Sequence, residues 1–268
     1  MDDVNGALRS GKNRKDLKAF FDEKVRAYDS PHFIKDDPIC IPHMFTKKQD
    51  IEIAGLFAAI FAWGNRTTII QKSRELMQRM DMAPHEFIAG HSSADLQRLQ
   101  GFRHRTFNED DLFYFIEFLQ FHYSRSNTLE TAFTQWMEKH DTTIEKALIG
   151  FKRYFFSLEH LRRTQKHISS PEQHSSCKRL CMYLRWMVRR DRQGVDFGIW
   201  RSIKPSQLIC PIDLHVARVA KRFGMMQRKQ PDWEAALELT SHLRNFDPHD
   251  PVKYDFALFG LGVIEKYT

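Results

Sequence analysis

The sequence predicts an all-α protein, and three observations support this fold class. Apolar residues recur at the helical spacing of three and four positions through most of the 268 residues. The alternating apolar and polar residues that are typical of half-buried strands are scarce, and only 12 Gly and 10 Pro interrupt the chain. The 22 Phe residues suit aromatic packing between helices, and a hydrophobic content of 42% is enough for a real core.

The N-terminal part of the chain predicts three helices and one connector. A first helix is expected over 14–29, where Leu17, Phe20 and other apolar residues share one face. Three prolines in 31–42 predict an extended connector. The run that follows is apolar on nearly every side, which predicts a buried helix over 51–63, and a second helix follows a Gly-Asn turn over 66–80.

The middle of the chain predicts further helices without evident chemistry. A Phe-rich helix is expected over 112–123, capped by Asn108 or Asp110, after short helices and turns. Two more helices are expected over 129–139 and 144–156, and the basic segment after them predicts a loop or a frayed helix.

The last third of the chain predicts four helices, over 175–188, 213–224, 232–244 and 252–266. We expect two helical lobes. One contains residues of about 46–170, and the other contains about 171–268 together with the N-terminal helix.

The charge balance indicates which partners the protein attracts. The chain carries 41 Lys and Arg against 34 Asp and Glu, a net charge of +7, and a basic protein attracts polyanions such as nucleic acid. No stretch of 18 apolar residues exists, and the acidic N-terminus lacks an apolar signal region, which favours a cytoplasmic protein without a membrane span. The four cysteines lack the spacing of a zinc site, so no metal is expected.

One stretch, at residues 210–224, combines a carboxylate with the start of a helix. Asp213 directly precedes a helical pattern in which Val216, Val219 and Phe223 share one face. An aspartate in this place caps a helix, so Asp213 has a purely structural explanation. The stretch also contains the motif apolar-Asp-x-His-Val-x-Arg, which is uncommon by chance.

This motif resembles the catalytic segment of the helix-hairpin-helix DNA glycosylase superfamily, the group of endonuclease III and 8-oxoguanine glycosylase. Leu214 replaces the threonine of that segment, and Ser175-Ser-Cys-Lys178 occupies the place of a Gly-Val-Gly-x-Lys hairpin without either glycine, which implies a degenerate hairpin. Lys178 matches the catalytic lysine of the superfamily, although a solvated helix lysine is the plain alternative. The matching residues of the motif itself are Ile212, Asp213, His215, Val216, Arg218, Val219, Arg222 and Gly224.

The gap between Lys178 and Asp213, 213 − 178 = 35 positions, is longer than is usual in the superfamily. The extra length is an insertion at 191–207, which we expect to form a surface loop.

Two further segments resemble the superfamily in the same order along the chain. Residues 62–69 resemble its first conserved helix pair, where a turn places a polar residue against the base opposite the lesion. Trp63 or Asn65 would lie in that turn, and packing of Trp63 in the core is the alternative. Residues 254–262 resemble its closing helix, and no cysteine cluster follows, so no iron–sulfur cluster is expected. The whole chain also resembles an uncharacterised bacterial family within this superfamily, common in Bacteroides relatives.

The resemblance implies a monomeric DNA repair glycosylase that acts on double-stranded DNA without a cofactor, in the cytoplasm at the nucleoid. Asp213 would stabilise positive charge on the sugar, and Lys178 would form a Schiff base if the enzyme also has AP-lyase activity. Trp186, Trp200 and Phe197 are candidate walls of the base pocket, with core packing as the alternative. A non-catalytic DNA-binding protein that retains the fold is the alternative function. The residues expected to contact DNA are Arg179, Arg185, Arg189, Arg218, Trp63 and Asn65, within a basic surface that extends from Arg162 to Arg192.

Overall fold

Helices make up all the regular secondary structure in residues 14–267, the part of the chain that this computed structural model describes. No strand occurs among these residues, and the only β-type pairings in them are two isolated bridges. The predicted all-α class is therefore confirmed. None of the helices in this range is long and apolar enough to cross a membrane.

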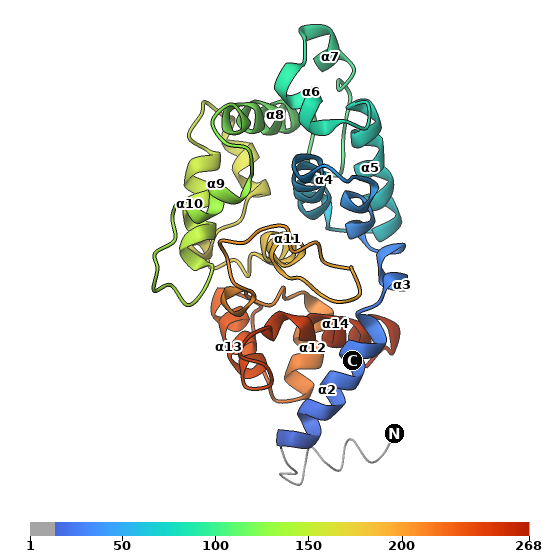
Figure 1. Cartoon of the computed structure of the whole chain (residues 1–268), viewed down its shortest axis with the longest axis vertical. Coiled ribbons are helices and arrows are strands. Elements are labelled where there is room, and N and C mark those ends of the chain that lie inside the picture. Colours follow the sequence, from blue (N-terminus) through green and yellow to red (C-terminus); the bar gives the residue numbers. More distant parts are fainter. Residues whose placement is uncertain (1–13, 268) are drawn as a thin grey trace.

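The helices are arranged on two sides of α11 (Lys178–Val188), which lies near the middle of the molecule (Figure 1). Towards one end lie α4 (Lys48–Phe61), α5 (Arg66–Arg79), α6 (Pro84–Gly90), α7 (Ser93–Gln97), α8 (Glu109–Tyr123), α9 (Glu130–Thr134) and α10 (Glu145–Phe155). Towards the other end lie α2 (Arg14–Tyr28), α12 (Leu214–Arg222), α13 (Trp233–Arg244) and α14 (Tyr254–Phe259), which continues as the π-helical turn η7 (Gly260–Ile264). The division into two lobes near residue 170 stays a prediction.

Helix α4 is the buried helix that its apolar sequence predicts, because every residue from Asp50 to Phe61 is buried. It packs against α11, where Tyr183 donates a hydrogen bond to the backbone oxygen of Glu52 at 3.0 Å. Gly55 allows this close approach, since a Cβ atom there would lie 2.8 Å from the methyl carbon of Met187. The packing fixes α11, and with it the position of Lys178 at the start of that helix.

The proline-rich segment 31–42 is not the extended connector that the sequence predicts. It forms three short helical turns: α3 (Pro31–Ile34), η1 (Pro38–Cys40) and η2 (Pro42–Met44). Each turn begins at a proline, whose fixed φ and missing N–H are compatible with the first position of a helix.

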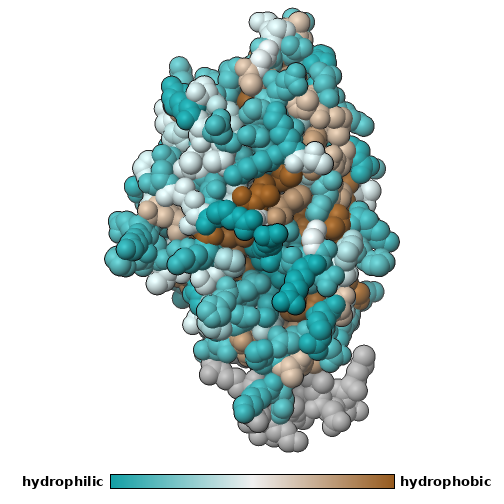
Figure 2. Space-filling model, viewed as in Figure 1, coloured by the Kyte–Doolittle hydropathy of each residue, from teal (hydrophilic) through white to brown (hydrophobic). Residues whose placement is uncertain are grey.

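The insertion at 191–207 is also not the surface loop that the sequence predicts. Val195, Asp196 and Trp200 are buried, with Trp200 only 1% exposed. The indole nitrogen of Trp200 donates to the carboxylate of Glu52 at 2.7 Å, which attaches the insertion to α4. Figure 2 shows a mainly polar face of the molecule, with apolar side chains gathered near its middle.

Candidate active site

Lys178 and Asp213 meet in space although 35 positions separate them in the sequence. Asp213 caps α12, because its Oδ1 accepts a hydrogen bond from the backbone N–H of Val216 at 2.8 Å. Its other oxygen, Oδ2, lies 3.2 Å from the Nζ of Lys178. The structural role and the contact with the amine therefore use different oxygens of one carboxylate. The two side chains are 35% and 20% exposed, so both remain accessible from solvent.

The pair lies in the wall of a pocket of about 460 Å³, a volume within the usual range for small-molecule sites. The turn between α4 and α5, the start of α11, the start of α12 and one face of α14 supply most of its lining. Three cations and three carboxylates line it, so its formal charges balance. The cations are Lys178, Arg66 and Arg185, the carboxylates are Asp37, Asp213 and Asp255, and the aromatic side chains are Phe33, Trp63, Phe256 and Phe259.

Two carboxyl groups of the pocket have perturbed protonation equilibria. Burial raises the pKa of Asp255 to about 6, against the opposing effect of Arg185, and the negative charge of Asp213 adds to the rise. Burial also raises the pKa of Asp37, while a hydrogen bond from the backbone of Ile39 opposes the rise. In residues 14–267, no group of three or more His, Cys, Asp or Glu side chains is placed to hold a metal ion.

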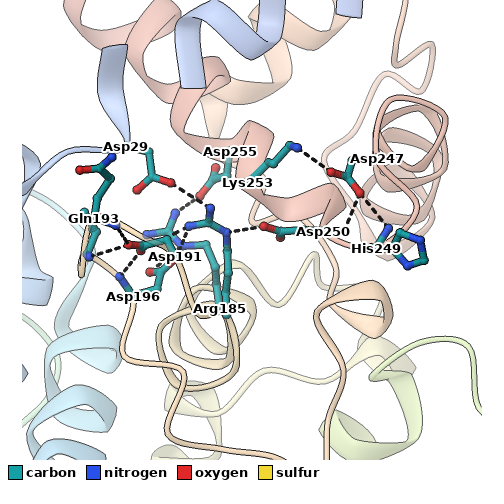
Figure 3. Close-up of polar contacts among 12 residues, drawn as sticks. Asp29, Arg185, Asp191, Gln193, Asp196, Asp247, His249, Asp250, Lys253 and Asp255 are labelled. Carbon is teal, nitrogen blue, oxygen red and sulfur yellow. Dashed lines mark hydrogen bonds and ion pairs between the residues drawn. The ribbon is translucent and has the colours of Figure 1, made fainter. Parts of the chain in front are cut away.

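The sequence predicts that Arg185 and Arg189 contact DNA phosphates, but neither side chain lies on the surface of the protein. Both are only 4% exposed. Figure 3 shows Arg185 among aspartates from several segments of the chain. Arg185 donates to Asp255 and, at 3.3 Å, to Asp196. The partners of Arg189, each at 2.9 Å, are Asp29, Asp196 and Asp250. The physical reason for the difference is that these carboxylates, of which Asp29, Asp250 and Asp255 are distant in sequence, supply the counter-charges that permit burial.

The other predicted DNA-contacting arginines differ in their exposure. Arg179 is half-buried, and its Nη1 donates to the backbone oxygen of Ile60 at 2.7 Å in the last turn of α4. Arg218 is exposed on α12. Several cations of the basic stretch are also exposed, namely Arg162, Lys166, Arg190 and Arg192.

Trp63 and Asn65 both line the pocket, on either side of a turn at Gly64. Trp63 is half-buried, and the guanidinium of Arg105 lies over its ring at 4.4 Å from the centroid. Asn65 is exposed, and its side chain accepts a hydrogen bond from the N–H of Thr68 at 3.1 Å to cap α5. Gly64 has a φ of +103°, a conformation that glycine adopts readily.

The segment before α11 adopts left-handed backbone conformations at residues other than glycine. His174 has a φ of 54° and Cys177 has a φ of 50°, and the two serines of Ser175-Ser-Cys-Lys178 lie between them. Non-glycine residues adopt this region at an energetic cost. The missing glycines therefore do not prevent the chain from making the turn that places Lys178 at the start of α11.

The aromatic lining of the pocket differs from the lining that the sequence predicts. Trp186 and Trp200 lie in the core, at 0% and 1% exposure, which confirms the core-packing alternative, and Phe197 packs on His43 outside the pocket. Among the lining residues that the sequence analysis did not assign to the site are Asp37, Arg66, Asp255, Phe33, Phe256 and Phe259.

A signal for some of these missed residues exists in the closing helix. Asp255 and Phe259 are four positions apart in the segment 254–262, so they share one helical face. Phe33 and Asp37 lie in the proline-rich segment and have no such signal.

The fold and the site together define an all-helical protein with a lysine–aspartate pair in the wall of an aromatic pocket. The chain belongs to the family described as a protein of unknown function, DUF2400, whose model matches residues 37–264. This range contains every residue named above as lining the pocket except Phe33. No curated protein and no solved structure gives a match to the chain. The predicted membership of an uncharacterised family is thus confirmed.

Proposed function

We propose that this protein is a DNA N-glycosylase that removes a damaged base, with Asp213 and Lys178 as its catalytic residues. The observation that carries the proposal is the 3.2 Å contact between these two groups in the wall of a pocket. The order of the motifs along the chain, from the turn at 62–69 to the closing helix at 254–262, supports it independently.

The two groups suit the breaking of an N-glycosidic bond. As the bond between C1′ and the base breaks, the base leaves with the electron pair, takes up a proton, and leaves positive charge on the sugar. The carboxylate of Asp213 would stabilise that charge, as glycosidase carboxylates do, until water adds to C1′ and loses a proton to leave the abasic sugar.

Lys178 would add AP-lyase activity if its neutral amine attacks C1′. The attacking amine must first lose a proton, and Asp213 is the group within 3.2 Å that can accept it. The amine attacks C1′ as the base leaves with the electron pair of the C1′–N bond. The C1′–O4′ bond then opens, O4′ takes up a proton, and a Schiff base remains between Nζ and C1′. Removal of a C2′ proton then expels the 3′ phosphate.

The pocket provides a place for a base that has left the DNA stack. A base in a duplex reaches such a site only after extrusion, and aromatic side chains stabilise the extruded base by stacking. Trp63 and Phe259 line the pocket beside the lysine–aspartate pair. Exposed cations of the basic stretch would attract the phosphate backbone.

Base release from a panel of duplexes, each with one oxidised, deaminated or alkylated base, tests the proposal. Asp213→Asn is expected to abolish release while DNA binding survives, since asparagine also caps a helix. Asp232→Asn is the matched control, because Asp232 caps α13 in the same way outside the pocket.

Borohydride trapping of a protein–DNA adduct tests the lyase step, and the adduct should be lost in Lys178→Gln. Binding of duplex DNA without base release from any lesion would instead favour the non-catalytic DNA-binding protein. Full activity in both Asp213→Asn and Lys178→Ala would exclude catalysis by this pair.

A further inference from the structure

Asp37 differs from the other two carboxylates that line the pocket. Asp213 pairs with Lys178 and Asp255 pairs with Arg185, whereas Asp37 forms no ion pair with any residue in 14–267. Its residue is only 8% exposed, so the carboxyl group is nearly shielded from solvent. A buried carboxylate without a counter-charge is unusual and requires an explanation.

Only one oxygen of Asp37 is used within the part of the chain that the structure describes. Oδ1 accepts a hydrogen bond from the backbone N–H of Ile39 at 3.0 Å, which caps the turn η1 and fixes the orientation of the carboxyl group. Oδ2 accepts no hydrogen bond from any residue in 14–267. Oδ2 is not among the fully buried atoms that lack a partner, so it retains contact with solvent, and a ligand in the pocket could supply a donor to it.

Positive charges act on Asp37 without forming an ion pair with it. Burial raises the pKa of this carboxyl group, and the positive charges of Arg185, Arg66 and Lys178 oppose the rise. None of these three cations lies within ion-pair distance, so the second oxygen is left for a ligand.

We infer that Asp37 reads the extruded base, with Oδ2 accepting a hydrogen bond from an N–H donor on the polar edge of its ring. The pocket would therefore select bases that carry a ring N–H at that edge. This inference rests on the proposed glycosylase function, and it names the chemistry of the substrate that the same pocket accepts.

The aromatic side chains and the carboxylate supply complementary parts of such recognition. Stacking on aromatic rings such as Trp63 and Phe259 holds any base by its faces and distinguishes bases poorly. A fixed hydrogen-bond acceptor at the ring edge discriminates strongly, because a base without the donor would cover the acceptor and leave it unpaired. Asp37 is thus assigned the selection of the base, and Asp213 and Lys178 are assigned the chemistry.

The Asp37→Asn variant tests this assignment with a minimal change. Asparagine retains an oxygen to cap η1 and has nearly the same size, but it replaces the second acceptor by an NH₂ donor. Duplexes with hypoxanthine, uracil or 8-oxoguanine are compared with duplexes that carry the N1-methyl or N3-methyl derivative of the same base. Single-turnover base release is measured for each.

The wild-type protein should release the ring N–H bases at least tenfold faster than their methyl derivatives. In Asp37→Asn, release of the ring N–H bases should fall by about 10- to 100-fold, and the preference over the methyl derivatives should largely disappear. Affinity for a duplex with a tetrahydrofuran abasic analogue, which has no base to read, should change by less than about twofold, which separates base reading from misfolding. Asp232→Asn should behave as the wild type in all three measurements.

The failures of the two proposals are distinguishable. If the wild-type protein releases no base from any duplex, the proposed function is wrong and the inference falls with it. If the wild type releases bases and Asp37→Asn shows the same rates and the same preference, only the assignment of Asp37 is wrong. A variant that also loses affinity for the abasic duplex would show that Asp37 acts through the fold, which overturns the assignment as well.

Discussion

Replacing Arg189 by alanine tests whether this side chain stabilises the core or contacts DNA. Three buried or half-buried carboxylates lie 2.9 Å from its guanidinium group, and a fourth, Asp191, lies at 3.5 Å. Removal of the cation leaves Asp29 and Asp250 without an ion-pair partner in residues 14–267 and leaves Asp196 with Arg185 alone, and breaking a buried ion pair in this way costs about 3–5 kcal/mol. Since natural domains are stable by only about 5–15 kcal/mol, this is a large share of the free energy of unfolding.

The effect should also depend on pH in a direction that the structure defines. Burial raises the pKa of Asp29 and of Asp196, and Arg189 is among the cations that oppose this rise. Without Arg189 the folded-state pKa of both groups rises further. A carboxyl group with a raised folded-state pKa stabilises the fold below its unfolded pKa and loses that contribution as pH increases through the folded pKa. The deficit of Arg189→Ala should therefore be larger at about pH 8 than at about pH 5.

Urea unfolding followed by circular dichroism measures this loss at both pH values. Arg190→Ala is the matched control, because Arg190 is the exposed neighbour of Arg189 and its removal should change stability by less than about 0.5 kcal/mol. The reasoning would be refuted if the two variants were equally stable, or if Arg189→Ala lost DNA affinity with its free energy of unfolding unchanged.

Three further predictions follow from individual residues. Burial would raise the pKa of Asp111, but hydrogen bonds from His167, from the backbone N–H of Asn108 and from the Thr164 hydroxyl outweigh burial and lower the pKa to about 2. The contribution of the Asp111 carboxylate to the stability of the fold is therefore lost as pH falls from about 4 through 2. Asp111→Asn should therefore flatten the pH dependence of stability in acid, measured by urea unfolding, and an unchanged slope would contradict this. His174→Gly should raise the free energy of unfolding by about 0.5–1 kcal/mol, because glycine relieves the left-handed backbone conformation, and a decrease would show that the imidazole matters more. Asp255→Asn should remove an inflection near pH 6 in the rate of base release, which increases with pH in the wild type as the Asp255 carboxyl gains negative charge in the pocket wall. Persistence of the inflection would assign it to another group.

The features that the sequence predicts well are those set by local pattern. The apolar run of α4, the cap at Asp213 and the helical face of α12 depend on residues within a few positions of one another. The contact between Lys178 and Asp213 is long-range, and the resemblance to a known motif order, rather than periodicity, indicates it. The catalytic activity proposed for that contact is tested by base release and by borohydride trapping.

The features that the sequence does not predict arise from tertiary packing. Arg185 and Arg189 read as surface cations because arginine is rarely buried, and their aspartate partners come from segments far apart in the chain. Asp37 enters the pocket from a proline-rich segment without helical periodicity, so no local pattern marks it. Charge compensation and pocket formation of this kind are properties of the whole fold.

The insertion at 191–207 explains how the pair stays together across the long gap in the sequence. Asp196 bonds to both buried arginines of this region, and Trp200 bonds to Glu52 of α4. The insertion is thus attached to the same helix, α4, against which α11 packs, and it supplies the counter-charge for Arg185 at the pocket. Because Arg185 in turn donates to Asp255, the inserted segment acts on the electrostatics of the pocket as well as on its shape. The separation of 35 positions between Lys178 and Asp213 is therefore compatible with their contact, since Val195, Asp196 and Trp200 of the intervening segment are buried against the rest of the fold.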